Sequence, residues 1–132
     1  MQKTLLFIDD DEAFLEIVRR ACAKIPAVGR LVEATDGAKG LEVIAAAAAN
    51  DAIPDLAFVD INMPVLDGFG FLNGLSELRA RHPALARMKP VAMLTSSDQE
   101  RDRRRAHELG ADVYIVKCVG IAATRETISR LV

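Results

Sequence analysis

Short apolar runs alternate with longer segments of helical periodicity along the whole chain. The apolar runs predict five strands, at residues 3–9, 30–34, 55–60, 90–95 and 112–116. The segments between and after them repeat apolar residues every three or four positions, which predicts helices at 11–24, 36–49, 68–81, 98–109 and 121–131. The third run, Leu56 to Val59, is apolar at every position, which indicates a strand buried on both faces.

Capping and turn residues mark several of these boundaries. Asp36 stands directly before the second helix as its predicted N-cap. Ser97, with Glu100 three residues later, predicts a capping box at the start of the fourth helix, and Gly110 is the predicted residue just beyond its end. A loop is predicted to begin at His82, directly before a proline.

The order of the elements predicts the fold class. Strands that alternate with helices require crossover connections and therefore form a parallel sheet. Five such units are too few for an eight-stranded barrel. The expected architecture is α/β: a three-layer, doubly wound, parallel five-stranded sheet with strand order 2-1-3-4-5, the flavodoxin-like arrangement. We expect one domain over residues 1–132, with no linker and no internal repeat.

Composition and charge exclude several classes of function. The chain has 132 residues, 51% of them hydrophobic, as expected for a folded domain with a core. Its net charge of −2 gives no electrostatic basis for binding nucleic acid or an anionic membrane. The apolar run near the N-terminus is too short for a signal peptide or a membrane span, so a cytoplasmic location is expected. The two cysteines, Cys22 and Cys118, have no metal-ligand spacing and are expected to be reduced thiols.

Polar residues follow four of the five predicted strands. The first strand ends in Asp9, Asp10 and Asp11, the third in Asp60, the fourth in Thr95-Ser96-Ser97 and the fifth in Lys117. In the proposed strand order these four strands are neighbours, so their ends meet at one edge of the sheet, where ligands bind in this fold class. Each residue alone has a simpler explanation, because aspartates cap helices and lysines are usually solvated. It is their combination that indicates a site.

The chemistry of this set is that of phosphoryl transfer. Clustered carboxylates suit Mg²⁺, and a carboxylate is itself able to act as the nucleophile that accepts a phosphoryl group. Phosphoryl transfer depends mainly on positioning and on neutralising charge. Lys117 and Mg²⁺ would supply positive charge, and the Thr95 hydroxyl would donate a hydrogen bond.

With this set of residues, the chain resembles the response regulator receiver domain. The resemblance is carried by Asp9-Asp10, Thr95, Lys117 and the segment Val59 to Gly68, which includes Asp60, and it covers nearly the whole chain. It implies a switch in a two-component phosphorelay that takes a phosphoryl group from a histidine kinase or phosphotransfer protein and signals to a downstream protein target. Such a protein is a phosphoacceptor rather than an enzyme, although it would catalyse its own phosphorylation and dephosphorylation.

The resemblance also implies a role for each site residue. Asp60 would be the phosphoacceptor. Asp10, Asp60 and the backbone carbonyl of Asn62 would ligate Mg²⁺ directly, with Asp9 acting through water.

The remaining implied roles concern switching. Thr95 and Lys117 would contact the phosphoryl oxygens. Tyr114 matches the aromatic switch residue that turns inward when the threonine hydroxyl moves to the phosphoryl group; the alternative is a half-buried strand tyrosine.

Two features depart from the common family pattern. Cys118 stands where a proline usually follows the lysine, and a cis bond before a non-proline residue would cost roughly 2.5–4 kcal/mol. The segment 79–89 is long. Together these features resemble the subclass of single-domain regulators paired with phytochrome-type kinases.

The fourth helix carries a run of charge, Arg101 to Arg105. The simpler interpretation is a solvated helix face with offsetting acids. In this family, however, the face formed by the fourth helix, fifth strand and fifth helix often binds partners or a second copy, so a homodimer through this face is a second interpretation. No effector domain follows the last helix, so output is expected through protein contacts unless the chain is a fragment.

Two other functions fit the sequence less well. A small phosphohydrolase of the haloacid-dehalogenase type needs Asp-x-Asp after its first strand and a second acid two residues beyond the nucleophile, whereas position 62 here is Asn. A receiver-like scaffold that works without phosphorylation is disfavoured because no acid or lysine of the set is missing.

Overall fold

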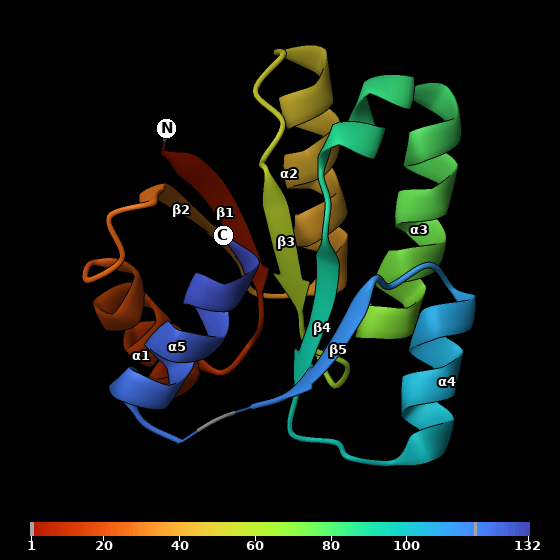
Figure 1. Cartoon of the computed structure of the whole chain (residues 1–132). Coiled ribbons are helices and arrows are strands. Elements are labelled where there is room, and N and C mark those ends of the chain that lie inside the picture. Colours follow the sequence, from red (N-terminus) through yellow and green to blue (C-terminus); the bar gives the residue numbers. More distant parts are fainter. Residues whose placement is uncertain (1, 118) are drawn as a thin grey trace.

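The computed structural model describes residues 2–117 and 119–132 and contains the predicted five-stranded parallel sheet (Figure 1). The strands are β1 (Lys3–Ile8), β2 (Val28–Ala34), β3 (Leu56–Val59), β4 (Val91–Thr95) and β5 (Val113–Val116). The helices are α1 (Glu12–Cys22), α2 (Gly37–Ala49), α3 (Gly68–Arg81), α4 (Glu100–Glu108) and α5 (Ile121–Leu131), with a 3₁₀ helix η1 (Pro83–Arg87). The strand order is β2-β1-β3-β4-β5, which confirms the predicted topology.

The helices form two layers around the sheet. α1 and α5 pack together on one face, and α2, α3 and α4 cover the other (Figure 1). Because side chains alternate along each strand, the core divides into two clusters. Leu5, Phe7 and Phe58 belong to the cluster under α1 and α5. Leu6 and Ile8 belong to the cluster under α2, α3 and α4. The predicted three-layer architecture is therefore confirmed.

The two strands at the centre of the site are held in register by an aromatic pair. Phe7 of β1 lies opposite Phe58 of β3, and the two rings stack with their centroids 4.4 Å apart and their planes inclined by 12°. Both side chains are about 1% exposed. The register continues to Ile8 and Val59, so the residues that follow the two strands emerge side by side.

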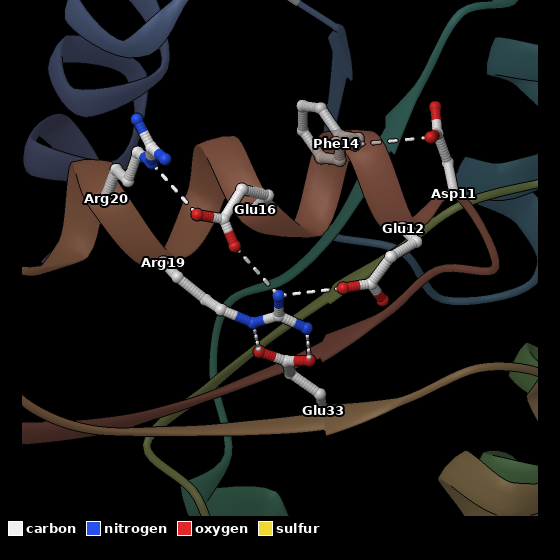
Figure 2. A network of polar contacts seen from close by, with 7 residues as sticks. All are labelled: Asp11, Glu12, Phe14, Glu16, Arg19, Arg20 and Glu33. Atoms are coloured by element: carbon white, nitrogen blue, oxygen red, sulfur yellow. Dashed lines mark hydrogen bonds and ion pairs between the residues drawn. The ribbon is translucent and has the colours of Figure 1, made fainter.

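Charged side chains fasten α1 to the edge strand β2 (Figure 2). The Arg19 guanidinium donates through two nitrogens to the carboxylate of Glu33 on β2, each bond 2.7 Å long. The same guanidinium also donates to Glu12 and Glu16 on its own helix. Bonds from Arg20 and Arg19 lower the pKa of the Glu16 carboxyl. One guanidinium thus bridges three carboxylates and fixes the position of α1.

Most predicted boundaries agree with the structure within two residues. α3 and α5 have the predicted bounds, Asp36 caps α2 through the Lys39 N–H at 2.8 Å, and Gly110 follows α4 with a φ of 103°. Two local predictions were wrong. The loop from His82 contains the 3₁₀ helix η1, and the capping box at Ser97 does not form, because α4 begins at Glu100 without a side-chain cap.

In the described part of the chain, the helices are either too short or too polar to cross a membrane.

Candidate functional site

The strand ends place acidic and basic side chains at one edge of the sheet. Asp9 and Asp60 directly follow β1 and β3, and their backbone N–H groups continue the sheet bonding, to the carbonyls of Ala34 at 2.9 Å and of Ile8 at 3.0 Å. Lys117 follows β5 in the same way, with its N–H donating to the Thr95 carbonyl at 2.7 Å. The side chains therefore leave a rigid sheet rather than mobile loops.

Strand alternation assigns these side chains to two faces of the sheet. Asp9 lies two residues beyond Phe7, Asp60 two beyond Phe58, and Lys117 two beyond Ile115, so all three share the face of α1 and α5. Thr95 lies two residues beyond Met93, whose cluster also contacts Tyr114, so these two share the face of α4. The charged centre and the Thr95–Tyr114 pair thus occupy opposite faces at neighbouring strand ends.

Three carboxylates form a compact cluster. Asp9, Asp10 and Asp60 each offer an oxygen, and these oxygens lie within 4.8 Å of one another. Asp9 and Asp60 are buried, whereas Asp10 is exposed. Like charges this close repel unless a cation offsets them, and oxygen ligands with one open side suit a hard divalent ion that retains water. The donor set therefore fits Mg²⁺.

The third acid of the run has a different role. Asp11 is the N-cap of α1, with its side chain accepting from the Phe14 N–H at 3.2 Å. The Asp11 N–H in turn donates to Asp9 Oδ1 at 2.9 Å. The alternative interpretation of helix capping is therefore correct for Asp11, while Asp9 and Asp10 join the carboxylate cluster.

Lys117 supplies the positive charge within this cluster. Its Nζ lies 2.8 Å from Asp9 Oδ2 and 3.5 Å from Asp60 Oδ2. It also lies 4.4 Å from the centre of the Phe14 ring, a cation–π contact that the sequence did not indicate. Burial by itself would lower the pKa of the ammonium, but the hydrogen bond to Asp9 and the neighbouring negative charges outweigh burial and raise the pKa.

The carboxyl groups of Asp9 and Asp60 differ in their surroundings. Burial raises the pKa of Asp9, the Asp60 charge adds to this, and the bonds from Lys117 and from the Asp11 N–H oppose it. Asp60 Oδ1 accepts from the Ile61 N–H at 2.8 Å, which orients the carboxylate. Its other oxygen, Oδ2, faces the lysine.

The β3–α3 connection follows Asp60, and where it meets α3 there is no room for a side chain at position 68. Gly68 opens α3, and its N–H donates to the Ile61 carbonyl at 2.8 Å. A Cβ at this position would collide with the Asp60 carbonyl oxygen and lie 2.8 Å from the Met93 methyl carbon. Glycine at position 68 therefore allows the start of α3 to hold the backbone at Asp60.

On the other face, Thr95 and Tyr114 are joined through the β4–α4 loop. Thr95 is fully buried, and its Oγ1 accepts from the Ser97 N–H at 3.3 Å. The Tyr114 hydroxyl donates to the Ser97 carbonyl at 2.8 Å, and the Arg103 guanidinium lies 4.6 Å above the tyrosine ring. Burial raises the pKa of the Tyr114 hydroxyl. The tyrosine is half-buried and packs against the core, so it lies on the inner side of the loop.

A polar cavity of about 510 Å³ opens between the β3–α3 and β4–α4 loops. Asn62, Ser97, Asp102 and Arg105 contribute to its walls. Asn62 is exposed two residues beyond Asp60, and its carbonyl as a metal ligand stays a prediction. Cys118 and the bond that joins it to Lys117 lie outside the described residues.

Comparison with known proteins agrees with this geometry. A sequence model of the response regulator receiver domain matches residues 5–129. Among curated relatives, the sensor histidine kinase CheAY of Helicobacter pylori is 38% identical over 113 residues, which are 86% of this chain and 13% of that protein. The transcriptional regulatory protein PhoP of Bacillus subtilis is 30% identical over 117 residues, which are 89% of this chain and 43% of that protein. The chain thus spans less than half the length of these relatives.

Solved structures show the same fold. The phosphorylated cyanobacterial phytochrome response regulator RcpA matches with a TM-score of 0.77 and 26% identity, covering 98% of this chain and 91% of that one. The chemotaxis protein CheY4 of Vibrio cholerae matches with a TM-score of 0.77 and 23% identity over the whole of both chains. The chain therefore belongs to the response regulator receiver domain family and is a phosphorylation-dependent switch of two-component signalling.

Proposed function

We propose that Asp60 is the phosphoacceptor of this receiver domain, which extends over residues 1–132. The observation that carries the proposal is the meeting of three carboxylates and one ammonium at the end of β1, β3 and β5. Of the two buried acids, Asp60 is the better nucleophile, because Asp9 is engaged by Lys117 at 2.8 Å and by the Asp11 N–H. Asp60 Oδ1 accepts from the Ile61 N–H, but its Oδ2 has the longer contact to Lys117, at 3.5 Å, and is the freer oxygen.

The metal in this proposal is Mg²⁺, held by Asp10 and Asp60 with the Asn62 carbonyl, and by Asp9 through water. The carboxylate oxygens within 4.8 Å of one another support this assignment. When bound, Mg²⁺ supplies positive charge that offsets the phosphoryl oxygens. A related structure, of the regulator Rcp1, is described as bound to Mn²⁺.

The protein's own groups position the transfer. The Ile61 N–H holds Asp60 Oδ1, so that Oδ2 attacks the phosphorus of a phosphohistidine. An O–P bond forms, the N–P bond breaks, and the leaving imidazole keeps the electron pair of that bond. Lys117 and the Thr95 hydroxyl contact the phosphoryl oxygens. Lys117 is already within reach, and Thr95 accepts from Ser97 and so retains its own hydrogen to donate.

Receiver domains are switches rather than enzymes with a turnover substrate. We propose in addition that this chain catalyses its own phosphorylation from small acyl phosphates and its own dephosphorylation. The exposure of Asp10, whose carboxylate lies in the same cluster as Asp60, supports access of water and small donors to the acceptor.

The proposed partners are proteins. Receiver domains act with histidine kinases or phosphotransfer proteins and with downstream targets. The similarity to RcpA makes a phytochrome-type kinase the first donor to test. We propose the α4–β5–α5 face as the output surface and as a homodimer interface, because Arg103 of α4 lies over the Tyr114 ring of β5 on this side, 4.6 Å from its centre. We also propose a cytoplasmic protein, and the net charge of −2 supports the absence of binding to nucleic acid or to an anionic membrane.

The test is labelling by acetyl phosphate with Mg²⁺, followed by intact-mass measurement. The wild type is expected to gain one phosphoryl group, and Asp60→Asn is expected to gain none. Asp51→Asn is the matched control, because Asp51 is an exposed carboxylate outside the cluster that pairs with Arg87 at 3.2 Å. A phosphoryl gain in Asp60→Asn, or none in the wild type, would contradict the proposal.

A further inference from the structure

Ser97 is tied to three different elements through three different groups. Its N–H donates to Thr95 Oγ1 at the end of β4, 3.3 Å away. Its carbonyl accepts from the Tyr114 hydroxyl of β5 at 2.8 Å. Its own hydroxyl donates to Asp102 Oδ2 on α4 at 2.6 Å. One loop residue therefore connects the buried threonine, the half-buried tyrosine and the fourth helix.

The bond to Asp102 is the shortest of the three and the one with a charged acceptor. Hydrogen bonds from a hydroxyl to a carboxylate are short and about twice as strong as neutral ones. Asp102 is half-buried in the first turn of α4, and its N–H donates to the Gln99 carbonyl at 3.1 Å, so its carboxylate is fixed to the helix. The Ser97 hydroxyl donates to Asp102 and accepts from the Gln99 N–H at 3.5 Å, while α4 begins at Glu100 with Gln99 in the N-cap position, two residues too late for the expected capping box.

This bond controls which way the Ser97 carbonyl faces. With the hydroxyl held by α4 and the N–H held by Thr95, the carbonyl is directed at Tyr114. Without Asp102, the bonds that hold Ser97 apart from the one to Tyr114 would be two long ones, at 3.3 Å to Thr95 and 3.5 Å from the Gln99 N–H, and the peptide group that carries its carbonyl would rotate more easily. Tyr114 would then lose its acceptor and keep only its contacts with Arg103 and the core.

We propose that Asp102 is a positioning residue of the switch. By holding Ser97, it keeps Tyr114 on the inner side of the β4–α4 loop before any phosphoryl group is present, and so presets the conformation that Thr95 needs when its hydroxyl contacts the phosphoryl group. The link to phosphorylation rests on the proposed function of Asp60 and Thr95. The link to Tyr114 does not depend on it.

The chain is well suited to a direct measurement, because it has one tyrosine and no tryptophan. Its ultraviolet emission therefore reports Tyr114 alone. The experiment is acrylamide quenching of this emission in the full chain, without phosphodonor, for the wild type and Asp102→Ala. We expect strong protection in the wild type. In Asp102→Ala we expect the ratio of inner to outer tyrosine to fall on the order of tenfold, the factor for one hydrogen bond to a charged group.

Four further variants separate positioning from general destabilisation. Ser97→Ala removes the same hydrogen bond by deleting its donor, and its tyrosine emission is expected to be quenched as much as that of Asp102→Ala. In the double variant the emission is expected to be quenched no more than in either single variant. Asp102→Asn keeps an acceptor oxygen and is expected to recover most of the protection. Glu108→Gln, an exposed change on the same helix, is expected to match the wild type. Circular dichroism and urea unfolding verify that each variant is folded.

A beryllofluoride titration with Mg²⁺ then tests the link to switching. Asp102→Ala is expected to regain tyrosine protection, at roughly tenfold more beryllofluoride than the wild type needs to saturate. Unchanged tyrosine protection in folded Asp102→Ala, or additive effects of the two single variants, would overturn the role of Asp102. If the wild type and Asp102→Ala need the same beryllofluoride concentration to saturate, the role of Asp102 in switching would be overturned. Acrylamide quenching is measured without phosphodonor, so its result does not depend on Asp60. If Asp60 is not labelled by acetyl phosphate but quenching changes as expected, the proposed function is wrong and the role of Asp102 in holding Tyr114 stands.

Discussion

Replacing Lys117 with methionine is expected to unbalance the charges at the edge of the sheet. The wild type sets one ammonium against three carboxylates, with Nζ 2.8 Å from Asp9 Oδ2 and 3.5 Å from Asp60 Oδ2. Methionine keeps much of the aliphatic chain but removes the charge. The three acids would then repel one another with no cation of the protein among them.

The size of the effect follows from burial. The side chains of Lys117, Asp9 and Asp60 are 13%, 3% and 9% exposed. Removing one partner of a buried pair costs about 3–5 kcal/mol. Because Asp10 is exposed and water reaches the cluster, we expect the lower end, about 3 kcal/mol of unfolding free energy at neutral pH. For a domain of this size that is a fall of roughly 10 °C in melting temperature.

The assay is urea unfolding in the presence of a chelator, followed by titration with Mg²⁺. Lys117→Met is expected to gain more stability from Mg²⁺ than the wild type, because the ion would replace the missing charge. The double variant Asp9→Asn with Lys117→Met is expected to recover most of the loss, since it restores the charge balance.

The pH dependence has a definite sign. The pKa of Lys117 is raised above its ordinary 10.5 in the folded state, so its stabilisation is present at neutral pH and is lost as pH rises through the raised pKa. The gap between wild type and variant should therefore close in strong base. Equal stability of the two proteins at neutral pH without metal, together with an equal response to Mg²⁺, would refute the view that this ammonium neutralises the cluster.

Three further predictions concern packing, the α1 clamp and the buried thiol. Gly68→Ala is expected to cost about 3 kcal/mol in urea unfolding, because backbone and a buried methyl group surround the site. Gly70→Ala should be nearly neutral, because only a flexible leucine side chain must move. Arg19→Met is expected to lower the melting temperature more than Arg20→Met, and high salt should shrink the difference, since Arg19 binds Glu33 through two nitrogens. Burial raises the pKa of the Cys22 thiol from 9.0 to about 11, so the thiol ionises more readily in the unfolded chain than in the folded one. Between pH 9 and 11, under reducing conditions, the unfolding free energy of the wild type should therefore fall by about 2–3 kcal/mol relative to that of Cys22→Ala. Parallel curves of unfolding free energy against pH would contradict this.

The fold was predictable because its signals are local and repeated. Each strand is a short apolar run, and each helix shows a 3.6-residue period, so element type and order follow from the pattern. The parallel topology then follows from the handedness of crossovers. The helix η1 was missed because its five residues, Pro83–Arg87, are too few to show a period.

The sequence predicted which residues form the site, but not which of them contact one another most closely. The acids and Lys117 could be brought together from strand order alone. The pattern did not show that Lys117 would pair more closely with Asp9 than with Asp60, because that depends on side-chain rotamers. The capping box at Ser97 failed because α4 begins at Glu100 with Gln99 in the N-cap position, so Ser97 precedes the helix start, and its hydroxyl donates to Asp102 instead.

The stacked rings of Phe7 and Phe58 have a consequence for ion selectivity. Each ring lies two residues before one of the buried carboxylates, so the backbones at Asp9 and Asp60 are held both by this packing and by the sheet bond from the Asp60 N–H to the Ile8 carbonyl. Loops that adjust freely can widen to coordinate a large ion such as Ca²⁺, but carboxylates anchored by a rigid spacer cannot. We therefore expect the interior of the sheet to make the proposed metal site favour small ions over large ones.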